Sequence, residues 1–155
     1  MSDVFHLHQI AGDFIEINLD GKTLKITPLT MRGRGAIGSV FCSQVKSPIA
    51  SVMELKSILP EESYKVALES AVKRQQYWPP AIDSQEALEV MAANLTMQTA
   101  LLAEMLRKYH PADCEQLAIE LMDSMTPIEY ARIGAYGWTA RRPDEPDFRK
   151  PPETP

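Results

Sequence analysis

Residues 14–27, FIEINLDGKTLKIT, constrain the fold more than any other stretch of the chain. The pair Asp20-Gly21 favours a type I′ turn, because glycine adopts a positive φ without strain. A two-residue loop also fixes the register of the two strands. It pairs Ile15 with Ile26, Ile17 with Leu24 and Leu19 with Lys22, and on the other face Glu16 with Lys25 and Asn18 with Thr23. The sequence therefore predicts an antiparallel hairpin with one apolar face.

Helix-start signals divide most of the remaining chain into about six helices. Thr30 and Ser47-Pro48 are typical helix starts, and Asp83–Glu86 and Thr126–Glu129 have the spacing of capping boxes. The expected helices cover residues 30 to about 46, 47 to about 59, 60 to about 76, 83 to about 109, 112 to about 124, and 126 to about 140. The predicted fold class is thus α+β, mostly α, with a hairpin followed by a helical bundle.

The length and composition indicate one domain with a tail. The chain has 155 residues, of which 45% are hydrophobic, which is enough for a core. We expect a single domain over residues 1–140, divided into a hairpin region (1–29) and a helical body (30–140). Residues 141–155 hold five of the twelve prolines, and we expect this tail to be disordered.

Other composition features indicate a cytoplasmic protein. The sequence has neither an uncharged apolar run of 18 residues nor the pattern of a signal peptide at its start. Cys42 and Cys114 match no metal or redox spacing, and we expect both to be small core residues in a reducing compartment.

The segment MRGRGAIGS contains a literal G-x-G-x-x-G at Gly33, Gly35 and Gly38. A dinucleotide site would need a parallel βαβ unit around these glycines and an acid on the ribose. Here the preceding strand belongs to an antiparallel hairpin and no strand is predicted to follow, which disfavours nucleotide binding. The alternative is packing: Gly35, Gly38, Ser39 and Cys42 form one stripe of small residues on a helix. Such a stripe lets a second helix, from this chain or from a partner, approach closely.

Charge is unevenly distributed along the chain. The net charge is −5, which disfavours general nucleic-acid binding. Residues 21–53, however, contain no Asp or Glu and five basic residues, Lys22, Lys25, Arg32, Arg34 and Lys46. This asymmetry predicts a surface that orients a partner protein or brings copies together head to tail, with a solvated basic face as the alternative.

No arrangement of residues predicts catalysis. His6 and His8 would share a strand face as a metal pair, but no third ligand is evident. His110, Asp113 and Cys114 surround a proline turn, where Asp113 suits a helix start. Cys114 begins an apolar stripe that continues through Leu117, Ala118, Leu121, Met122 and Met125. We therefore expect no catalytic residue, no cofactor and no metal.

The predicted helix over residues 83–109 carries a heptad pattern. Leu88, Met91, Leu95, Gln98, Leu102, Met105 and Tyr109 follow the alternating spacing of three and four that marks a coiled-coil seam. The pattern favours the central helix of a bundle over an intermolecular seam. Methionines such as Met91 and Met105 would form an adaptable binding surface if this face stayed exposed.

The stretch IEINLDGKTLKITPLTMR resembles the N-terminus of tail assembly chaperones of tailed bacteriophages. The resemblance implies a non-enzymatic helper that binds the tape-measure protein in the host cytoplasm and keeps it soluble during tail assembly. On this interpretation the candidate partner-binding residues are Lys25, Arg32, Arg34, Gly35, Gly38, Cys42, Met91 and Met105. Two other functions stay open: a structural phage component such as a neck or head–tail joining protein, and a nucleic-acid-binding module that uses residues 22–46. We expect the protein to self-associate, and we expect no membrane partner.

Overall fold

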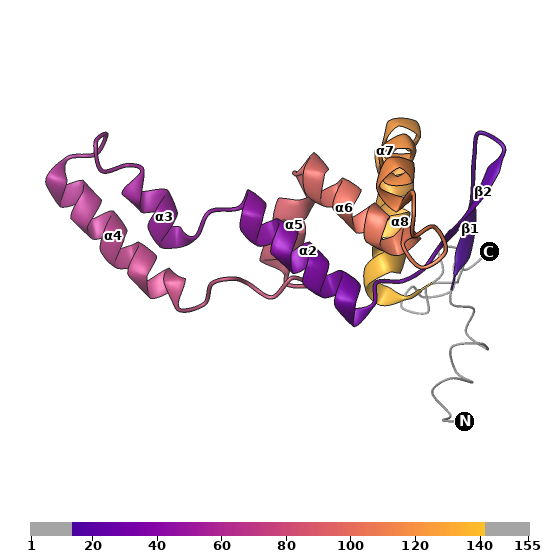
Figure 1. The fold of residues 1–155 in the computed structure, drawn as a ribbon. Helices are drawn as coiled ribbons and strands as arrows, with labels where there is room; N and C mark the ends of the chain where they lie inside the picture. The colour runs from indigo at the N-terminus through magenta and orange to yellow at the C-terminus, as the bar shows by residue number, and fades with distance from the viewer. Residues whose placement is uncertain (1–13, 142–155) are drawn as a thin grey trace, which may run out of the picture. The chain divides into compact units, whose positions relative to one another are not determined.

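The computed structural model describes residues 14–141, which form two compact units (Figure 1). Among these residues, the first unit combines 14–30 with 101–141, and the second covers 31–100. The strands are β1 (Ile15–Leu19) and β2 (Lys22–Ile26). The helices are α2 (Met31–Gln44), α3 (Pro48–Met53), α4 (Glu61–Gln75), α5 (Gln85–Ala92), α6 (Leu95–Leu106), α7 (Cys114–Ser124) and α8 (Pro127–Thr139). The predicted α+β, mostly α, class is confirmed, while the single domain over residues 1–140 stays a prediction. The expected disorder of the tail concerns residues that lie, apart from Arg141, outside the described part.

The hairpin has the predicted turn and the predicted register. Asp20 and Gly21 both have positive φ, 48° and 80°, as a type I′ turn requires. All five cross-strand pairs are those expected from the two-residue loop. Leu19, Leu24 and Ile26 are buried on the apolar face. Turn chemistry and strand alternation were sufficient to specify this element.

The outer edge of β2 and its extension is closed by helix ends. The backbone N–H groups of Lys25, Thr27 and Leu29 alternate along the chain and point to the same side. They donate to His110 Nε2 (3.1 Å), to the Met105 carbonyl (2.9 Å) and to the Gly137 carbonyl (2.9 Å), respectively. Met105 and Gly137 lie in the last turns of α6 and α8, where carbonyls lack partners within the helix. The strand edge and the two helix ends thus satisfy one another.

The core of the first unit lies among α6, α7 and α8. Of the stripe predicted on α7, Cys114, Leu117, Ala118 and Leu121 are buried, whereas Met122 and Met125 are only half-buried. A Cβ added to Gly137 of α8 would lie 2.7 Å from Met105 Sδ. The helical glycine that permits a close approach within the chain is therefore on α8, at a position that no sequence pattern marks.

The predicted helix over residues 83–109 is in fact two helices, α5 and α6. The Asn94 side chain accepts a hydrogen bond from the Met97 N–H (3.0 Å), as a residue capping a helix start does. Gln98 Nε2 donates to the Ala92 carbonyl (2.6 Å) at the end of α5. The break changes which residues face inward: Leu95 is 67% exposed, whereas Met97 is fully buried. The continuous heptad seam is therefore wrong, because an asparagine cap interrupts it.

The other predicted helix starts are largely confirmed. Ser47 caps α3 and accepts a hydrogen bond from the Ala50 N–H. The capping box of α8 has both of its hydrogen bonds, between Thr126 and Glu129. At α5 the cap is Ser84, and the predicted Asp83 instead forms an ion pair with Arg34 (3.6 Å).

Candidate protein-binding surface

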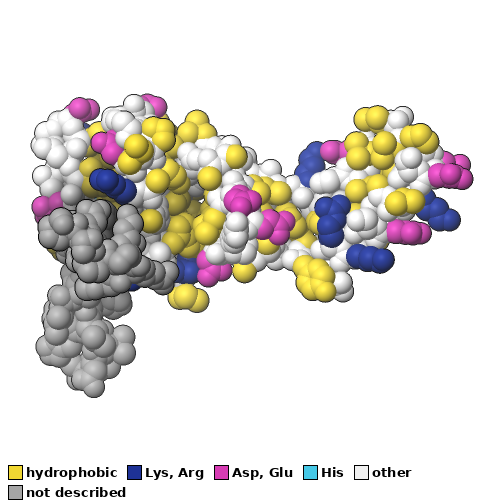
Figure 2. Space-filling view, turned by 180° about the vertical axis from the view of Figure 1, so that it is seen from behind, with side chains coloured by type: hydrophobic (Ala, Val, Ile, Leu, Met, Phe, Trp, Pro, Cys, Tyr) yellow, Lys and Arg dark blue, Asp and Glu magenta, His cyan; other side chains and the backbone are white. Residues whose placement is uncertain are grey.

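The second unit has a small core and many exposed apolar side chains. Its buried apolar residues are Ile37, Phe41, Val52, Ala71, Ala87, Met91 and Met97. Eight of the ten large hydrophobic side chains exposed in the described part of the chain also belong to this unit: Met31, Met53, Leu55, Ile58, Val66, Val72, Tyr77 and Leu95. Hydrophobic side chains are visible on the surface over the α3–α4 part of the chain in Figure 2. Because large exposed apolar patches are typical of interaction sites, this unit is the candidate for a protein-binding surface.

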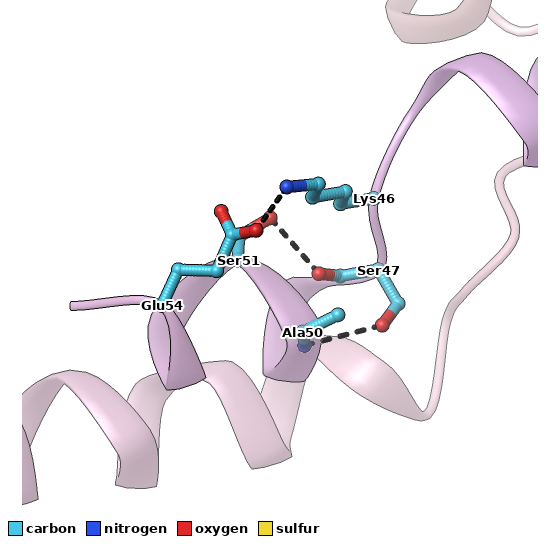
Figure 3. Close-up of polar contacts among 5 residues, drawn as sticks. All are labelled: Lys46, Ser47, Ala50, Ser51 and Glu54. Atoms are coloured by element: carbon cyan, nitrogen blue, oxygen red, sulfur yellow. Dashed lines mark hydrogen bonds and ion pairs between the residues drawn. The ribbon is translucent and has the colours of Figure 1, made fainter. Parts of the chain in front are cut away.

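Local polar contacts hold the start of α3 in place (Figure 3). Ser51 Oγ donates to the Ser47 carbonyl (3.0 Å), and Lys46 forms an ion pair with Glu54. The Ile49 N–H donates to Gln75 Oε1 of α4 (3.2 Å), which connects the two helices of this pair. These polar contacts connect α3 with α4, although few side chains of the pair are buried. Several of its apolar side chains therefore remain exposed.

The small-residue stripe of α2 faces open space. A Cβ added to Gly35 or to Gly38 would meet no atom within 4 Å. Ser39 and Cys42 are exposed, and the stripe forms one side of an open groove whose other side includes Pro79, Pro80 and Ile82. Within residues 14–141 no helix packs on this stripe. The predicted packing partner is thus not found in the described chain.

The position of Cys42 corrects the sequence analysis, whereas the glycines lie in a helix as predicted. Cys42 is exposed and is not a core residue, because α2 turns Ile37 and Phe41 inward and the stripe outward. Gly33, Gly35 and Gly38 all lie within α2 and not in a strand-to-helix turn. The sheet of the described residues is a two-stranded antiparallel hairpin, so the βαβ context of a dinucleotide site is absent there.

The predicted basic residues are divided between the two units. Lys25 lies in the first unit, with Nζ 4.9 Å from the centroid of the Phe14 ring. Arg32 and Arg34 lie in the second, where Arg32 is exposed and Arg34 pairs with Asp83. The five basic residues of the segment 21–53 are therefore divided between the two units. Two of them already form ion pairs, Arg34 with Asp83 and Lys46 with Glu54.

The two methionines that were predicted to contact a partner are not at the surface. Met91 is 5% exposed and Met105 is fully buried. Both therefore belong to the cores and cannot contact a partner in this conformation. Met31 and Met53 are exposed instead. Met31 precedes Gly35 by one helical turn, so the spacing along α2 was the signal that could have placed it beside the stripe.

Two titratable side chains of the described residues have clearly shifted pKa values. The hydrogen bonds that the Arg107 guanidinium donates to the Glu104 carboxylate raise the pKa of Arg107, and burial raises the pKa of Tyr130 to about 12. Among residues 14–141, no group of three His, Cys, Asp or Glu side chains could hold a metal ion. The candidate pair His6 and His8 lies outside the described residues. None of the helices described is both long enough and apolar enough to cross a membrane.

Comparison of the chain with models of protein families, with curated proteins and with solved structures finds no match.

The raised pKa of Tyr130 predicts a loss of stability at alkaline pH. The folded state keeps the phenol neutral up to about pH 12, whereas in the unfolded chain it ionises near pH 10. The folded state therefore binds more protons between these values, and the free energy of unfolding falls as the pH rises from 10 to 12. Urea unfolding at several pH values should show a steeper fall for the wild type than for Tyr130→Phe. Equal slopes would contradict the assignment.

Proposed function

We propose that this protein is a non-enzymatic assembly chaperone that covers apolar surface on another protein. The observation that carries the proposal is the exposure of apolar side chains in residues 31–100, which expose more large apolar side chains than they bury. A unit of this composition gains stability when a partner covers it. The open stripe on α2 supports the proposal, since glycines within a helix are unfavourable and nothing in the described chain packs against Gly35 or Gly38.

More specifically, we propose a tail assembly chaperone of a tailed bacteriophage, acting in the host cytoplasm on the tape-measure protein. The support for this is the resemblance of residues 15–32 to that family, together with the exposed apolar side chains of the second unit. A long helical partner offers apolar ridges, and these fit grooves between helices. Self-association of the chaperone along such a partner is part of the proposal.

The stripe on α2 gives a direct test of the partner surface. Gly35→Ala with Gly38→Ala should stabilise the free protein by about 1 kcal/mol per substitution, because alanine is the better helix former. The added methyl groups should at the same time weaken capture of a co-expressed tape-measure protein by about tenfold, since overpacking a close helix contact costs about 1–3 kcal/mol. Thermal unfolding and co-purification measure the two effects.

Opposite signs of these two effects separate a binding defect from a folding defect. Lost capture by a more stable variant cannot be caused by unfolding. Unchanged capture by the double variant would remove the stripe from the contact. Failure of the wild-type protein to retain any tape-measure protein would overturn the chaperone proposal itself, as would stoichiometric amounts of the chain in purified virions by mass spectrometry.

A further inference from the structure

A second groove of the same unit lies beside the segment YWPP, residues 77–80. It is lined by residues of the α2–α3 link, of the end of α4 and of this segment, among them Lys46, Pro48, Arg74, Tyr77, Trp78 and Pro80. Its volume is about 320 Å³, which is at the lower end of the range for ligand pockets and too small for a helix about 10 Å in diameter. The groove therefore suits a few residues of extended chain.

Two aromatic rings with different roles meet in this groove. Trp78 packs against Phe41, with ring centroids 5.6 Å apart, which fixes the indole. The Tyr77 side chain is 77% exposed, so its ring is available to a ligand. Prolines 48 and 80 complete the apolar lining. Grooves lined by aromatic rings bind polyproline II segments, because that conformation is already extended and loses little entropy on binding.

One basic side chain of the groove is available to an acidic ligand. Lys46 and Arg74 line it, against one acid, Glu86. Lys46 already pairs with Glu54, whereas none of the ion pairs among residues 14–141 includes Arg74. An acidic group bound beside the tyrosine would therefore find a guanidinium able to form a charge-assisted hydrogen bond.

The chain itself contains a segment of matching chemistry. Residues 143–147 read PDEPD and combine two prolines with three acids. Polyproline II has three residues per turn, so prolines spaced three apart lie on one edge and the acids flank them. We propose that the Tyr77 groove binds residues 143–147 of a neighbouring copy, with the prolines against the aromatic rings and an acid on Arg74. Such a contact between two different surfaces joins copies head to tail or, when two copies exchange the segment, as a reciprocal pair.

The test uses the purified full-length chain alone, so its outcome is independent of any tape-measure protein. Light scattering should show a mass that rises above the 17.4 kDa monomer with concentration. Pro143→Ala with Pro146→Ala should return it to the monomer. Arg74→Glu should weaken self-association at least fivefold, and Lys73→Glu should not. Lys73 is the matched control because it lies in the same turn of α4, is exposed and does not line the groove.

A synthetic peptide of residues 141–155 gives a second readout. In a Trp138→Phe background, Trp78 is the only tryptophan and should report binding of the peptide by a change in fluorescence. Tyr77→Ala should weaken this binding, and a peptide with Asp144→Lys and Glu145→Lys should bind the Arg74→Glu variant better than the wild type. Equal binding by the Arg74→Glu and Lys73→Glu variants would overturn the proposal. A monomer at all concentrations would overturn it too.

Discussion

Gly137→Val is expected to lower the free energy of unfolding by about 1–3 kcal/mol, the range for overpacking a well-packed interior. A Cβ at this position already lies 2.7 Å from Met105 Sδ and 3.1 Å from its Cε. The Met105 side chain is fully buried, so it can make room only by repacking against other side chains of the core. Moving α8 away instead would disturb the hydrogen bond from the Leu29 N–H to the Gly137 carbonyl. Either response removes stabilising contacts.

Gly38→Val is the matched control for this substitution. It places the same side chain at a glycine within a helix, but a Cβ there meets no atom within 4 Å. Valine forms helices slightly better than glycine, so this variant should be as stable as the wild type or slightly more stable. Urea unfolding followed by circular dichroism compares the two variants. Equal destabilisation of both would show that the close approach of α8 to Met105 is not what Gly137 provides.

Gly137 and Gly38 illustrate which features of the fold the sequence predicts and which it does not. The hairpin was predicted down to its register, because the turn and the cross-strand pairs are encoded within fourteen residues. Helix starts at Ser47 and Thr126 were predicted for the same reason, since capping is local. Which glycine meets another helix depends on residues far away in the chain. Gly35 and Gly38 form a conspicuous stripe with no partner in the described chain, while Gly137 meets Met105 without a conspicuous pattern.

The candidate surface was harder to predict than the fold. The stripe at Gly35, Gly38 and Cys42 is accessible, as a binding role requires. Met91 and Met105 followed a heptad pattern that is equally typical of a core and of a binding face, and burial decides between them only once the fold is known. Tyr77 lies just beyond the predicted helix over residues 60–76, where no pattern in the sequence predicts a binding role. Only the structure shows that Tyr77 is exposed and that it lines a groove together with Arg74.

Leu102→Ala is expected to cost about 2–5 kcal/mol, the range for removing a leucine side chain from a core. Leu102 is fully buried in α6, and its sequence neighbours Leu101 and Ala103 are buried too, so this part of the helix lies within the core. The loss should appear as a lower midpoint of urea unfolding with an unchanged slope. A loss of this size is a large part of the stability of a small domain and should also reduce the soluble yield.

Leu95→Ala in the same helix is the control for Leu102→Ala. A continuous heptad seam would bury both leucines and make both substitutions costly. In the structure the break at Asn94 leaves Leu95 67% exposed at the first position of α6, so its truncation should change stability by less than about 0.5 kcal/mol, as for most surface substitutions. Similar large losses at both positions would favour an unbroken helix over residues 83–109 and contradict the cap at Asn94. A large loss at Leu102 alone is what two helices and an inward-facing Met97 require.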